Sequence, residues 1–338
     1  MRTLLGTAAL LIAASTTTPA FAAVRMVNPH TAFPSQQSAM QRFANPNALQ
    51  KLLYVGDNAN NQISVFSLKG KHPSTKPIYV ISSGLFGPQG LTTDRHGNLW
   101  VTNLYGNTVL EYAPGALTPS FGLTNNINSP TDVKVDAAGN VYVANSPGLG
   151  SQSYILKFPA GSTTPSSVWF TPYGNEIISS LALLNPTNPA ATSIYAAAYI
   201  VNPSTLLATG YILSCYPGSS NQCVQINPTT FGQTGGILVE QSPGGAKPFQ
   251  YSVVDQYVPG IDTFTNQQLS GQTVTGGTPQ MIALTSSKKD MFVADQFYGR
   301  VTEYSWPSGT VLNQFYPATG NSRTIIIGVA VSPAGTYF

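Results

Sequence analysis

Charged side chains are scarce in this chain of 338 residues. Lys, Arg, Asp and Glu make up 8% of it, and the formal net charge is +3, whereas an average soluble protein carries roughly 25% charged residues. Lys288-Lys289 is the only adjacent basic pair, and no longer basic cluster occurs. Nucleic-acid binding needs a concentrated basic surface, so this composition excludes a nucleic-acid partner.

Reactive side chains are also few. The chain has three histidines, His30, His72 and His96, and two cysteines. It contains no Gly-x-Ser-x-Gly nucleophile elbow, no phosphate-binding loop and no Cys–His pairing for nucleophilic catalysis. The common sequence signals of hydrolases that use a serine, a cysteine or a nucleotide are therefore missing.

The two cysteines stand close together. Cys215 and Cys223 bracket the segment Tyr-Pro-Gly-Ser-Ser-Asn-Gln, which is typical of a turn. In an oxidising compartment this spacing predicts one disulfide across a hairpin. The alternative is a pair of buried free thiols; metal binding is disfavoured because no histidine or further cysteine accompanies them.

Long apolar runs are missing except at the N-terminus. Arg2 precedes the apolar stretch from Leu4 to Ala14, and Ala20-Phe21-Ala22 has the small-x-small pattern of a cleavage site. These features predict a secretory signal peptide over residues 1–22, cleaved after Ala22, and hence a secreted or periplasmic protein without membrane insertion after cleavage. Residues 23–50 are polar and interrupted by prolines, so we expect a flexible leader before a single domain at 51–338.

Gly, Asn and Pro, by contrast, recur in a pattern. The run from Pro88 to Gly115 is repeated from Pro130 to Gly161. Each copy contains short runs rich in β-branched and aromatic residues, joined by an Asp-x-x-Gly-Asn turn. A repeat of roughly 40–50 residues built from short strands is typical of a radially repeated β architecture. The period-2 alternation between turn signals predicts the individual strands.

Aligned on this repeat, the chain divides into six units. We expect the innermost strands to begin near Gly90, Asp132, Ser180, Gly236, Met281 and Gly328. The first unit starts at its second strand, Leu53–Asp57, while Ile326–Ser332 is a first strand with almost nothing after it. Pairing the two would close the ring without an exposed sheet edge. The sequence therefore predicts an all-β, six-bladed β-propeller closed by a C-terminal strand on the N-terminal blade; seven blades is the main alternative.

The repeat resembles a known family. The run Pro-x-Gly-Leu-x-x-Asp-x-x-Gly-Asn-Leu-Trp-Val-x-Asn, followed by a strand ending Glu-Tyr-Ala-Pro-Gly, resembles the NHL repeat and the wider set of gluconolactonase-like and streptogramin-lyase-like propellers. The resemblance covers most of residues 51–338 and implies the fold. It implies little about activity, because such propellers include enzymes, ligand binders and protein-interaction modules.

Most acidic residues occupy repeated positions. One position at the end of the second strand is filled in five units by Asp57, Asn103, Asn145, Asp255 and Asp295. We interpret these as turn formers that bond nearby backbone N–H groups. Glu111 and Glu303 share a third-strand position and are also interpreted as structural. His72 and His96 fall in turns on the face away from the usual site of such propellers and are interpreted as solvated, which disfavours a His-dependent hydrolase or lyase.

Two acids fall outside the repeat pattern. Asp132 replaces a glycine where the chain enters its first strand, and Glu176 precedes the first strand of the next unit. Two carboxylates with amide and carbonyl oxygens nearby suit a divalent cation such as Ca²⁺. The resemblance to gluconolactonases implies a divalent metal held by acidic and asparagine ligands from several blades. No asparagine stands at a matching first-strand entrance in the neighbouring units of this chain. The alternative is a solvated rim, or Asp132 paired with Lys134.

Aromatic residues suggest a binding surface instead. Tyr199 stands in a divergent unit with a long insertion at 202–209, and inserted loops commonly form a propeller's binding surface. The candidate ligand contacts are Tyr105, Tyr199, Tyr257, Phe297, Tyr298, Gln89 and Gln280. Our hypothesis is a non-catalytic binding or scaffold module that recognises a small molecule, a glycan or an exported protein; the alternative is a metal-dependent lactonase-like hydrolase using Asp132 and Glu176.

Overall fold

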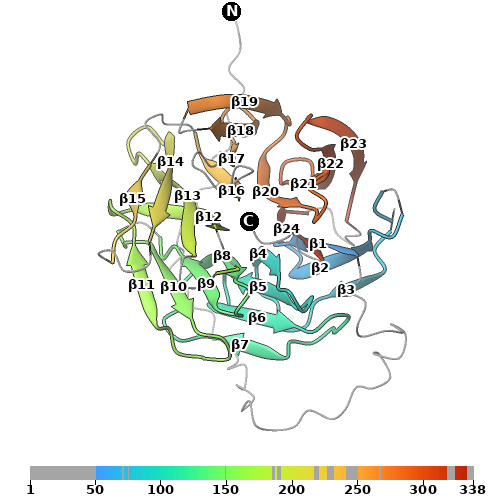
Figure 1. Cartoon of the computed structure of the whole chain (residues 1–338), viewed down its shortest axis with the longest axis horizontal. Helices are drawn as coiled ribbons and strands as arrows, with labels where there is room; N and C mark the ends of the chain where they lie inside the picture. The colour runs from blue at the N-terminus through green and yellow to red at the C-terminus, as the bar shows by residue number, and fades with distance from the viewer. Residues whose placement is uncertain are drawn as a thin grey trace, which may run out of the picture.

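The computed structural model describes residues 51–332 except 71, 75, 149, 185–186, 189–191, 217–220, 227–231, 241–249, 266–267 and 318–323. The expected signal peptide and leader lie outside these residues. The described residues form 24 strands and no helix, arranged as six four-stranded antiparallel sheets around a common axis (Figure 1). The chain is thus a six-bladed β-propeller, which confirms the predicted fold. The described part of the chain has no helix long and apolar enough to cross a membrane.

We number the blades 1 to 6 from the N-terminus. In blade order, the innermost strands are β24 (Ile326–Ser332), β4 (Pro88–Thr93), β8 (Pro130–Val135), β12 (Glu176–Leu184), β16 (Thr234–Glu240) and β20 (Pro279–Leu284). The second strands are β1 (Leu52–Asp57), β5 (Leu99–Asn103), β9 (Val141–Asn145), β13 (Ser193–Val201), β17 (Gln250–Asp255) and β21 (Asp290–Asp295).

The outer half of each blade completes the sheet. The third strands are β2 (Gln62–Ser67), β6 (Thr108–Tyr112), β10 (Tyr154–Phe158), β14 (Ala208–Cys215), β18 (Gly260–Thr265) and β22 (Arg300–Ser305). The fourth strands are β3 (Tyr79–Ile81), β7 (Phe121–Leu123), β11 (Ser167–Phe170), β15 (Val224–Gln225), β19 (Gln268–Val274) and β23 (Thr310–Phe315).

The ring closes between the two ends of the domain. β24 pairs antiparallel with β1, with Leu52 opposite Ser332 and Val55 opposite Val329. Blade 1 is therefore built from both ends of the chain, as the incomplete terminal units predicted. Closing the sheet this way leaves no unpaired strand edge at the junction.

Each innermost strand contains an irregularity at the same place. The pairing of the first with the second strand shifts register once in every blade, as between Pro130 and Asp132 in blade 3. A β-bulge of this kind bends the strand where it enters the channel. Pairing continues beyond the bulge, so β4, β8, β16, β20 and β24 begin two residues before the expected positions, and β12 begins four before.

The hydrophobic core lies between the blades. The buried side chains form six clusters, and each cluster joins one blade to the next around the ring, including blade 6 to blade 1. A second strand is therefore covered on both faces, which explains why every residue of β1, β5 and β9 is buried. Such packing holds the loops at the ends of the strands in fixed positions.

Candidate functional site

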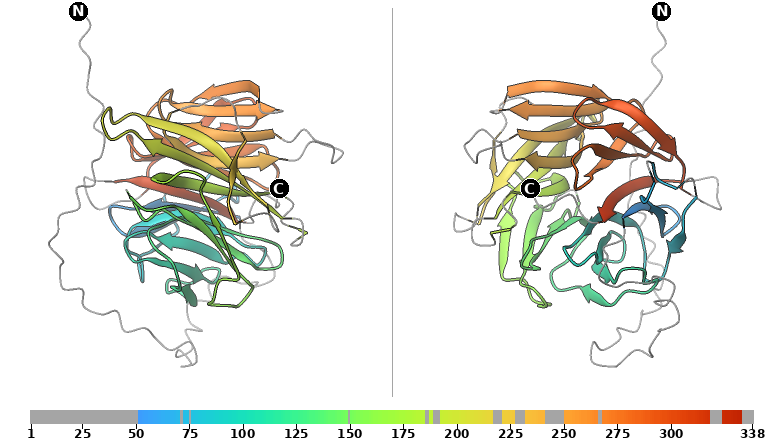
Figure 2. Two further views of the ribbon diagram at one scale, coloured as in Figure 1. Left: turned by 90° about the vertical axis from the view of Figure 1, so that its left-hand side faces the viewer. Right: turned by 45° about the vertical axis from the view of Figure 1, so that its right-hand side comes forward.

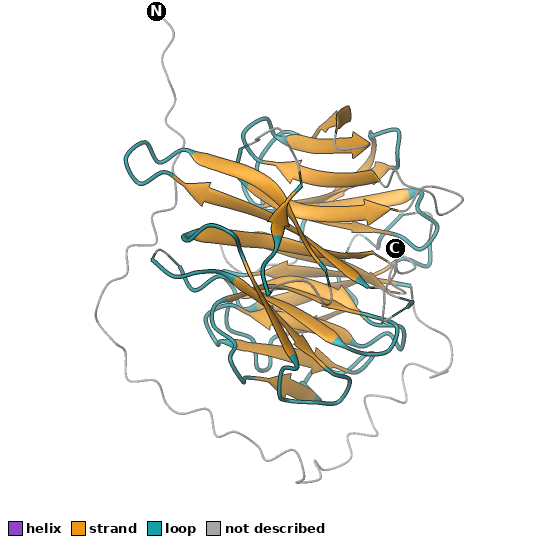
Figure 3. Ribbon diagram, turned by 60° about the vertical axis from the view of Figure 1, so that its left-hand side comes forward, coloured by secondary structure: helices purple, strands orange, loops and turns teal. Residues whose placement is uncertain are grey.

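The two faces of the ring differ in the connections that they carry. Figure 2 shows the ring edge-on. We call the loop face the side that carries the connections from second to third strands and those into each innermost strand, and the turn face the opposite side. The loop-face connections from second to third strands are 58–61, 104–107, 146–153, 202–207, 256–259 and 296–299. The hairpin of β13 and β14, yellow-green to yellow in the left view of Figure 2, projects beyond its neighbours on this side. Figure 3 shows the connecting loops, in teal, at the two ends of the strands.

Exposed apolar side chains gather on the loop face. The large hydrophobic residues exposed there are Phe86, Tyr105, Tyr173, Leu206, Leu207, Tyr257, Val258, Phe297, Tyr298 and Tyr316. On the turn face, the corresponding residues among those described are Ile78, Leu117 and Tyr216. Five further exposed hydrophobic residues lie on the fourth strands: Val80, Val224, Leu269, Val311 and Leu312. More of the exposed large hydrophobic residues thus lie on the loop face than anywhere else on the described surface, and a concentration of this kind is a mark of an interaction site.

The blade 6 part of this surface is held by one acid. Asp295 Oδ1 accepts hydrogen bonds from the backbone N–H groups of Phe297 and Tyr298, at 3.1 and 3.3 Å. The two rings pack edge to face with centroids 4.9 Å apart. The Arg300 guanidinium lies 4.3 Å from the Tyr298 ring centroid and 3.5 Å from Asp295 Oδ2. Phe297 is 73% exposed, and the hydrogen bonds to Asp295 hold the loop that carries it.

The blade 2 part is built differently. Phe86 and Tyr105 pack edge to face with centroids 5.5 Å apart, and the Tyr105 ring lies directly on Gly87. Asn103 holds the loop, since its Oδ1 accepts from the N–H of Phe86 at 2.8 Å and its Nδ2 donates to the carbonyl of Gly84 at 2.7 Å. Asn103 thus acts as the turn former expected from the repeat.

The other turn formers make equivalent bonds. Asp57, Asn145 and Asp255 accept hydrogen bonds from backbone N–H groups of adjacent loop-face connections. In blade 5 the Asp255 bond goes to Tyr257, whose ring lies on Gly232. Side chains at the ends of the second strands therefore fix the loops that carry the exposed rings.

Tyr199 is not part of this exposed surface. It lies within β13, half-buried, and its hydroxyl accepts a hydrogen bond from Gln233 Nε2 at 3.4 Å. Burial raises its pKa to about 12. Of the five aromatic candidates from the sequence, the structure places four at the exposed surface and Tyr199 beneath it.

The glutamine candidates lie at the channel entrance, both half-buried. Gln280 accepts a hydrogen bond from Gln256 at 3.1 Å and donates one to Gln296 at 2.7 Å. These hydrogen bonds link the side-chain amides of blades 5 and 6. Gln256 directly precedes Tyr257 in the chain, and Gln296 directly precedes Phe297. Gln89 lies in the bulge of β4, where its carbonyl faces Gly328 of blade 1.

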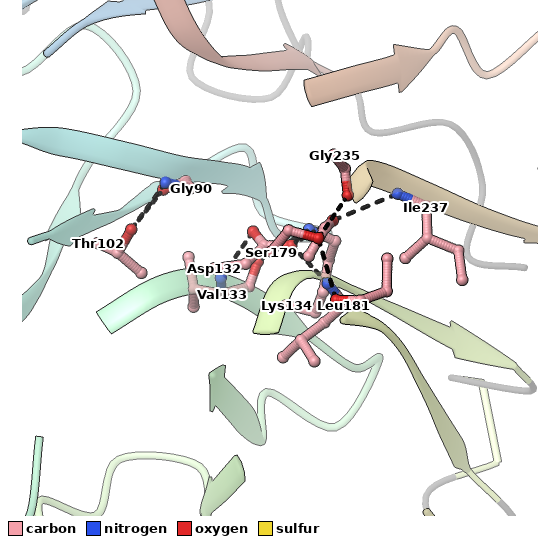
Figure 4. A network of polar contacts seen from close by, with 11 residues as sticks. Gly90, Thr102, Asp132, Val133, Lys134, Ser179, Leu181, Gly235 and Ile237 are labelled. Atoms are coloured by element: carbon pink, nitrogen blue, oxygen red, sulfur yellow. Dashed lines mark hydrogen bonds and ion pairs between the residues drawn. The ribbon is translucent and has the colours of Figure 1, made fainter. Parts of the chain in front are cut away.

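Asp132 joins two blades at the channel (Figure 4). Its Oδ2 accepts from Lys134 Nζ at 2.7 Å, from Ser180 Oγ at 2.8 Å and from the Leu181 N–H at 2.7 Å, while Oδ1 accepts from the Val133 N–H at 2.8 Å. Asp132 is 1% exposed. A carboxylate with four donors, one of them an ammonium, has little accepting capacity left for a cation.

Glu176 has different surroundings. It is buried in blade 4, its Oε1 accepts from the Tyr173 N–H at 2.9 Å, and desolvation raises the pKa of its carboxyl group. Among the described residues, no hydrogen bond or ion pair joins it to Asp132. Within the same residues, no group of three or more His, Cys, Asp or Glu side chains is arranged to hold a metal ion. The structure thus gives each acid its own structural partner.

The disulfide lies outside the loop face. Cys215 ends β14 and Cys223 precedes β15, and the two form the expected disulfide with Cα atoms 4.3 Å apart. Both are buried in the cluster between blades 3 and 4. The bond therefore anchors the short fourth strand of blade 4.

Sequence analysis did not identify all of the loop-face residues. Phe86 and Tyr173 lie in connections into innermost strands, Tyr316 follows β23, and Leu206 and Leu207 end the long hairpin. The position of each residue directly before or after a predicted strand was the sequence signal that could have placed it on the loop face. His72, interpreted as solvated, instead contacts Glu303 through Nδ1 and Oε2 at 3.1 Å on the turn face. That contact spans 231 positions in the chain, so no local pattern marks it.

Comparisons with known proteins agree with the fold. No protein-family model and no curated protein matches the chain. Among solved structures, it is similar to a chain of the "Crystal structure of Nidogen/Laminin Complex", with a TM-score of 0.58 and 14% identity over 84% of this chain and 98% of that one. It is also similar to a functionally unknown protein from Desulfotomaculum acetoxidans, with a TM-score of 0.52 and 14% identity over 82% and 99% of the two chains. At this identity the likeness is one of fold, in agreement with an NHL-like six-bladed propeller.

Proposed function

We propose that this protein is an exported, non-catalytic binding module whose loop face docks another exported protein. One observation carries the proposal: exposed aromatic rings gather on this face, and the scaffold beneath holds them in place. Protein-binding surfaces are enriched in Tyr, Phe and Trp and depleted of charge at their centres. The rings are already positioned, so docking costs little side-chain entropy.

The charge of the loop face favours a neutral contact. Asp57, Asp255 and Asp295 are buried beneath the loops, and Arg300 is paired with Asp295. Neither a strongly acidic nor a strongly basic partner would gain much there. Tyrosine hydroxyls and glutamine amides supply the polar contacts that fix the orientation of a docked chain.

Export and a protein partner have further support. The N-terminal pattern of a signal peptide and the disulfide both fit an oxidising compartment. The similar propeller comes from a crystal structure of a nidogen/laminin complex, an assembly of two proteins. A propeller of this shape is therefore a suitable scaffold for protein recognition.

The lactonase alternative has less support. It needs Asp132 as a metal ligand, yet the Asp132 carboxylate is paired with Lys134 and bonded to blade 4. A divalent cation there would have to displace the ammonium group and break the joint between blades. Separation of Asp132 from Glu176 by different partners favours the binding module.

The test combines capture with matched variants. The mature protein, chemically cross-linked within the exported fraction of its own cell, would identify a partner, which is then purified for affinity measurements. Phe297→Ser/Tyr298→Ser should weaken binding about 30-fold or more, because truncating central anchors costs at least about 2 kcal/mol. Leu117→Ser changes an exposed apolar residue on the turn face and should leave affinity unchanged. Equal affinity of both variants for the partner would overturn the proposal.

A further inference from the structure

A cavity opens on the turn face, away from the proposed docking surface. It lies between blades 2 and 3 and has a volume of about 310 Å³. Its walls include Asp94, Trp100, Glu111, Phe121, Asp136 and Ala160. This volume is at the lower end of the range for small-ligand sites.

Two of the three carboxylates in the cavity are fully used by their own turns. Asp94 accepts from the N–H groups of His96 and Asn98, from the Asn98 amide and from Trp100 Nε1. Asp136 accepts four hydrogen bonds from the corresponding turn of blade 3. Both lie in the Asp-x-x-Gly-Asn turns of the repeat, and neither needs a ligand.

Glu111 is the exception. It is half-buried, and none of the hydrogen bonds or ion pairs of the described residues involves its carboxylate. Desolvation, followed by the charge of Asp94, raises the pKa of this carboxyl group. A half-buried carboxyl group without a donor is unfavourable, and a cationic donor would relieve it.

The same chain shows what an occupied version of this site looks like. Glu303 occupies the position of Glu111 in blade 6, and its carboxylate contacts the His72 ring of the next blade at 3.1 Å. His72 comes from the connection at 68–78 between β2 and β3. The equivalent connection beside Glu111, at 159–166, is shorter and presents Ala160 and Gly161. Where blade 1 supplies a nitrogen base, blade 3 leaves a cavity.

The rest of the wall suits an organic cation. The Trp100 and Phe121 rings pack edge to face with centroids 6.1 Å apart, and the Trp100 indole is fixed by its bond to Asp94. Such rings favour alkyl chains and cationic groups at close range. Arg95 lines the exposed rim, where its Nε donates to His96 Nε2 at 3.0 Å. Three carboxylates against one guanidinium leave the cavity with negative charge when Glu111 is ionised.

We propose that this cavity binds a small organic cation through a protonated amine, which donates hydrogen bonds to the Glu111 carboxylate while its alkyl part packs against Trp100 and Phe121. The amine takes the place that the His72 imidazole takes beside Glu303. Two sources carry this chemistry: a free alkylamine, and a lysine side chain presented by another protein.

The test follows the Trp100 indole N–H by ¹H–¹⁵N NMR during titration with n-butylammonium chloride. We expect a saturable shift of this resonance, without comparable shifts of Trp169 and Trp306, and at least tenfold weaker binding of n-butanol. Nα-acetyl-lysine N-methylamide distinguishes the sources: binding equal to n-butylammonium indicates a lysine side chain, and exclusion of this bulkier probe indicates a free amine. Sodium chloride at equal concentration controls for ionic strength.

Four variants complete the experiment. Glu111→Gln keeps the shape of the side chain and should weaken amine binding at least tenfold, and Ala160→His should abolish it by supplying the imidazole from within. Val311→Ser, at an exposed position of β23 in blade 6, should bind the amine like the unmodified protein. Arg95→Gln should bind the amine no less tightly, because Arg95 donates to His96 and not to Glu111. The proposal is overturned if the unmodified protein shows no saturable shift, if Glu111→Gln binds equally well, or if only Arg95→Gln binds, because Arg95 would then be the partner of Glu111.

Discussion

The Tyr105 ring packs on Gly87 so closely that a Cβ at Gly87 would lie 2.4 Å from ring carbon Cδ2. Tyr257 and Gly232 repeat the arrangement in blade 5, where the corresponding distance is 2.1 Å. In both blades the glycine precedes the innermost strand and the tyrosine follows the second strand. Two blades thus support an exposed tyrosine on a neighbouring backbone, a feature expected of a surface that must present rings in a fixed orientation.

Gly87→Ala should destabilise the protein and displace Tyr105. Gly87 has a φ of +71°, where a side chain costs roughly 1–2 kcal/mol, and the added Cβ would also collide with the ring. We expect the free energy of unfolding to fall by about 2–3 kcal/mol, measured by urea unfolding. Adding Tyr105→Ala should relieve the collision and leave the backbone cost, so the double variant should be more stable than Gly87→Ala alone.

Gly232→Ala separates collision from backbone strain. Gly232 has no left-handed backbone, so the substitution should act through Tyr257 alone. Gly232→Ala combined with Tyr257→Ala should therefore recover most of the stability lost in the single variant. If the double variant stays as unstable as Gly232→Ala, the ring does not pack on this glycine in solution.

The disulfide should contribute measurably to stability. Cys215 and Cys223 are separated by 8 positions, and closing so short a loop in the unfolded chain is worth roughly 2–3 kcal/mol in the chain-entropy model. We expect Cys215→Ser/Cys223→Ser to lower the free energy of unfolding by this amount. Both sulfurs are buried, so a reducing agent should reach the disulfide only in unfolded molecules. Equal urea midpoints for the oxidised protein and the double variant would contradict the prediction.

The strands were predictable because their signals are local. β1 runs from Leu52 to Asp57, one residue longer than the range Leu53–Asp57 expected from alternation and turn residues. Closure by β24 was predictable because the two terminal units were each incomplete. The fourth strands were not placed. β15 has two residues and β3 and β7 have three each, too short for a periodicity. β23 is long enough, but most of its side chains are exposed, so its sequence lacks the alternation of a half-buried strand.

The candidate site was only partly predictable. Tyr105, Tyr257, Phe297 and Tyr298 follow second strands, so their face could be derived from the topology. The burial of Tyr199 depends on the length of the β13–β14 hairpin, and the contacts of Asp132 depend on blade 4. The cavity at Glu111 exists because a neighbouring connection is short, which becomes evident only once blades 2 and 3 are packed together.

The Glu303 carboxyl group should make stability depend on pH. Desolvation raises its pKa above the usual 4.5, opposed by His72 and assisted by Asp290. Between pH 4.5 and the raised value the folded protein binds more protons than the unfolded chain, so the free energy of unfolding falls as pH rises through this window. Glu303→Gln should remove this part of the slope in urea midpoints measured from pH 4 to 8.

His72→Ala is the companion variant. The imidazole lowers the pKa of Glu303. Removing it should therefore extend to higher pH the range over which the free energy of unfolding falls, as long as Glu303 is present. Adding Glu303→Gln to His72→Ala should abolish the extension. An unchanged slope in Glu303→Gln would mean that other carboxyl groups with raised pKa, such as Glu176, account for the dependence.

Asp132→Ala should test the joint between blades 3 and 4. Its removal leaves the Lys134 ammonium without its anion and deprives Ser180 and the Leu181 N–H of their acceptor. Removing one partner of a buried ion pair costs roughly 3–5 kcal/mol, and we expect the lower end because Lys134 is 25% exposed. Lys134→Met should cost less than Asp132→Ala, since the Asp132 carboxylate keeps three donors, two of them backbone N–H groups.

Chelation decides between this structural role and a metal site at Asp132. If Asp132 works as a joint, EDTA should leave the Tm of the unmodified protein unchanged, and the loss of stability in Asp132→Ala should be the same with and without Ca²⁺. A Tm that falls with EDTA and recovers with Ca²⁺ only while Asp132 is present would instead assign a metal to this carboxylate. That result would favour the lactonase-like alternative, because the ammonium of Lys134 would have to yield its place to the cation.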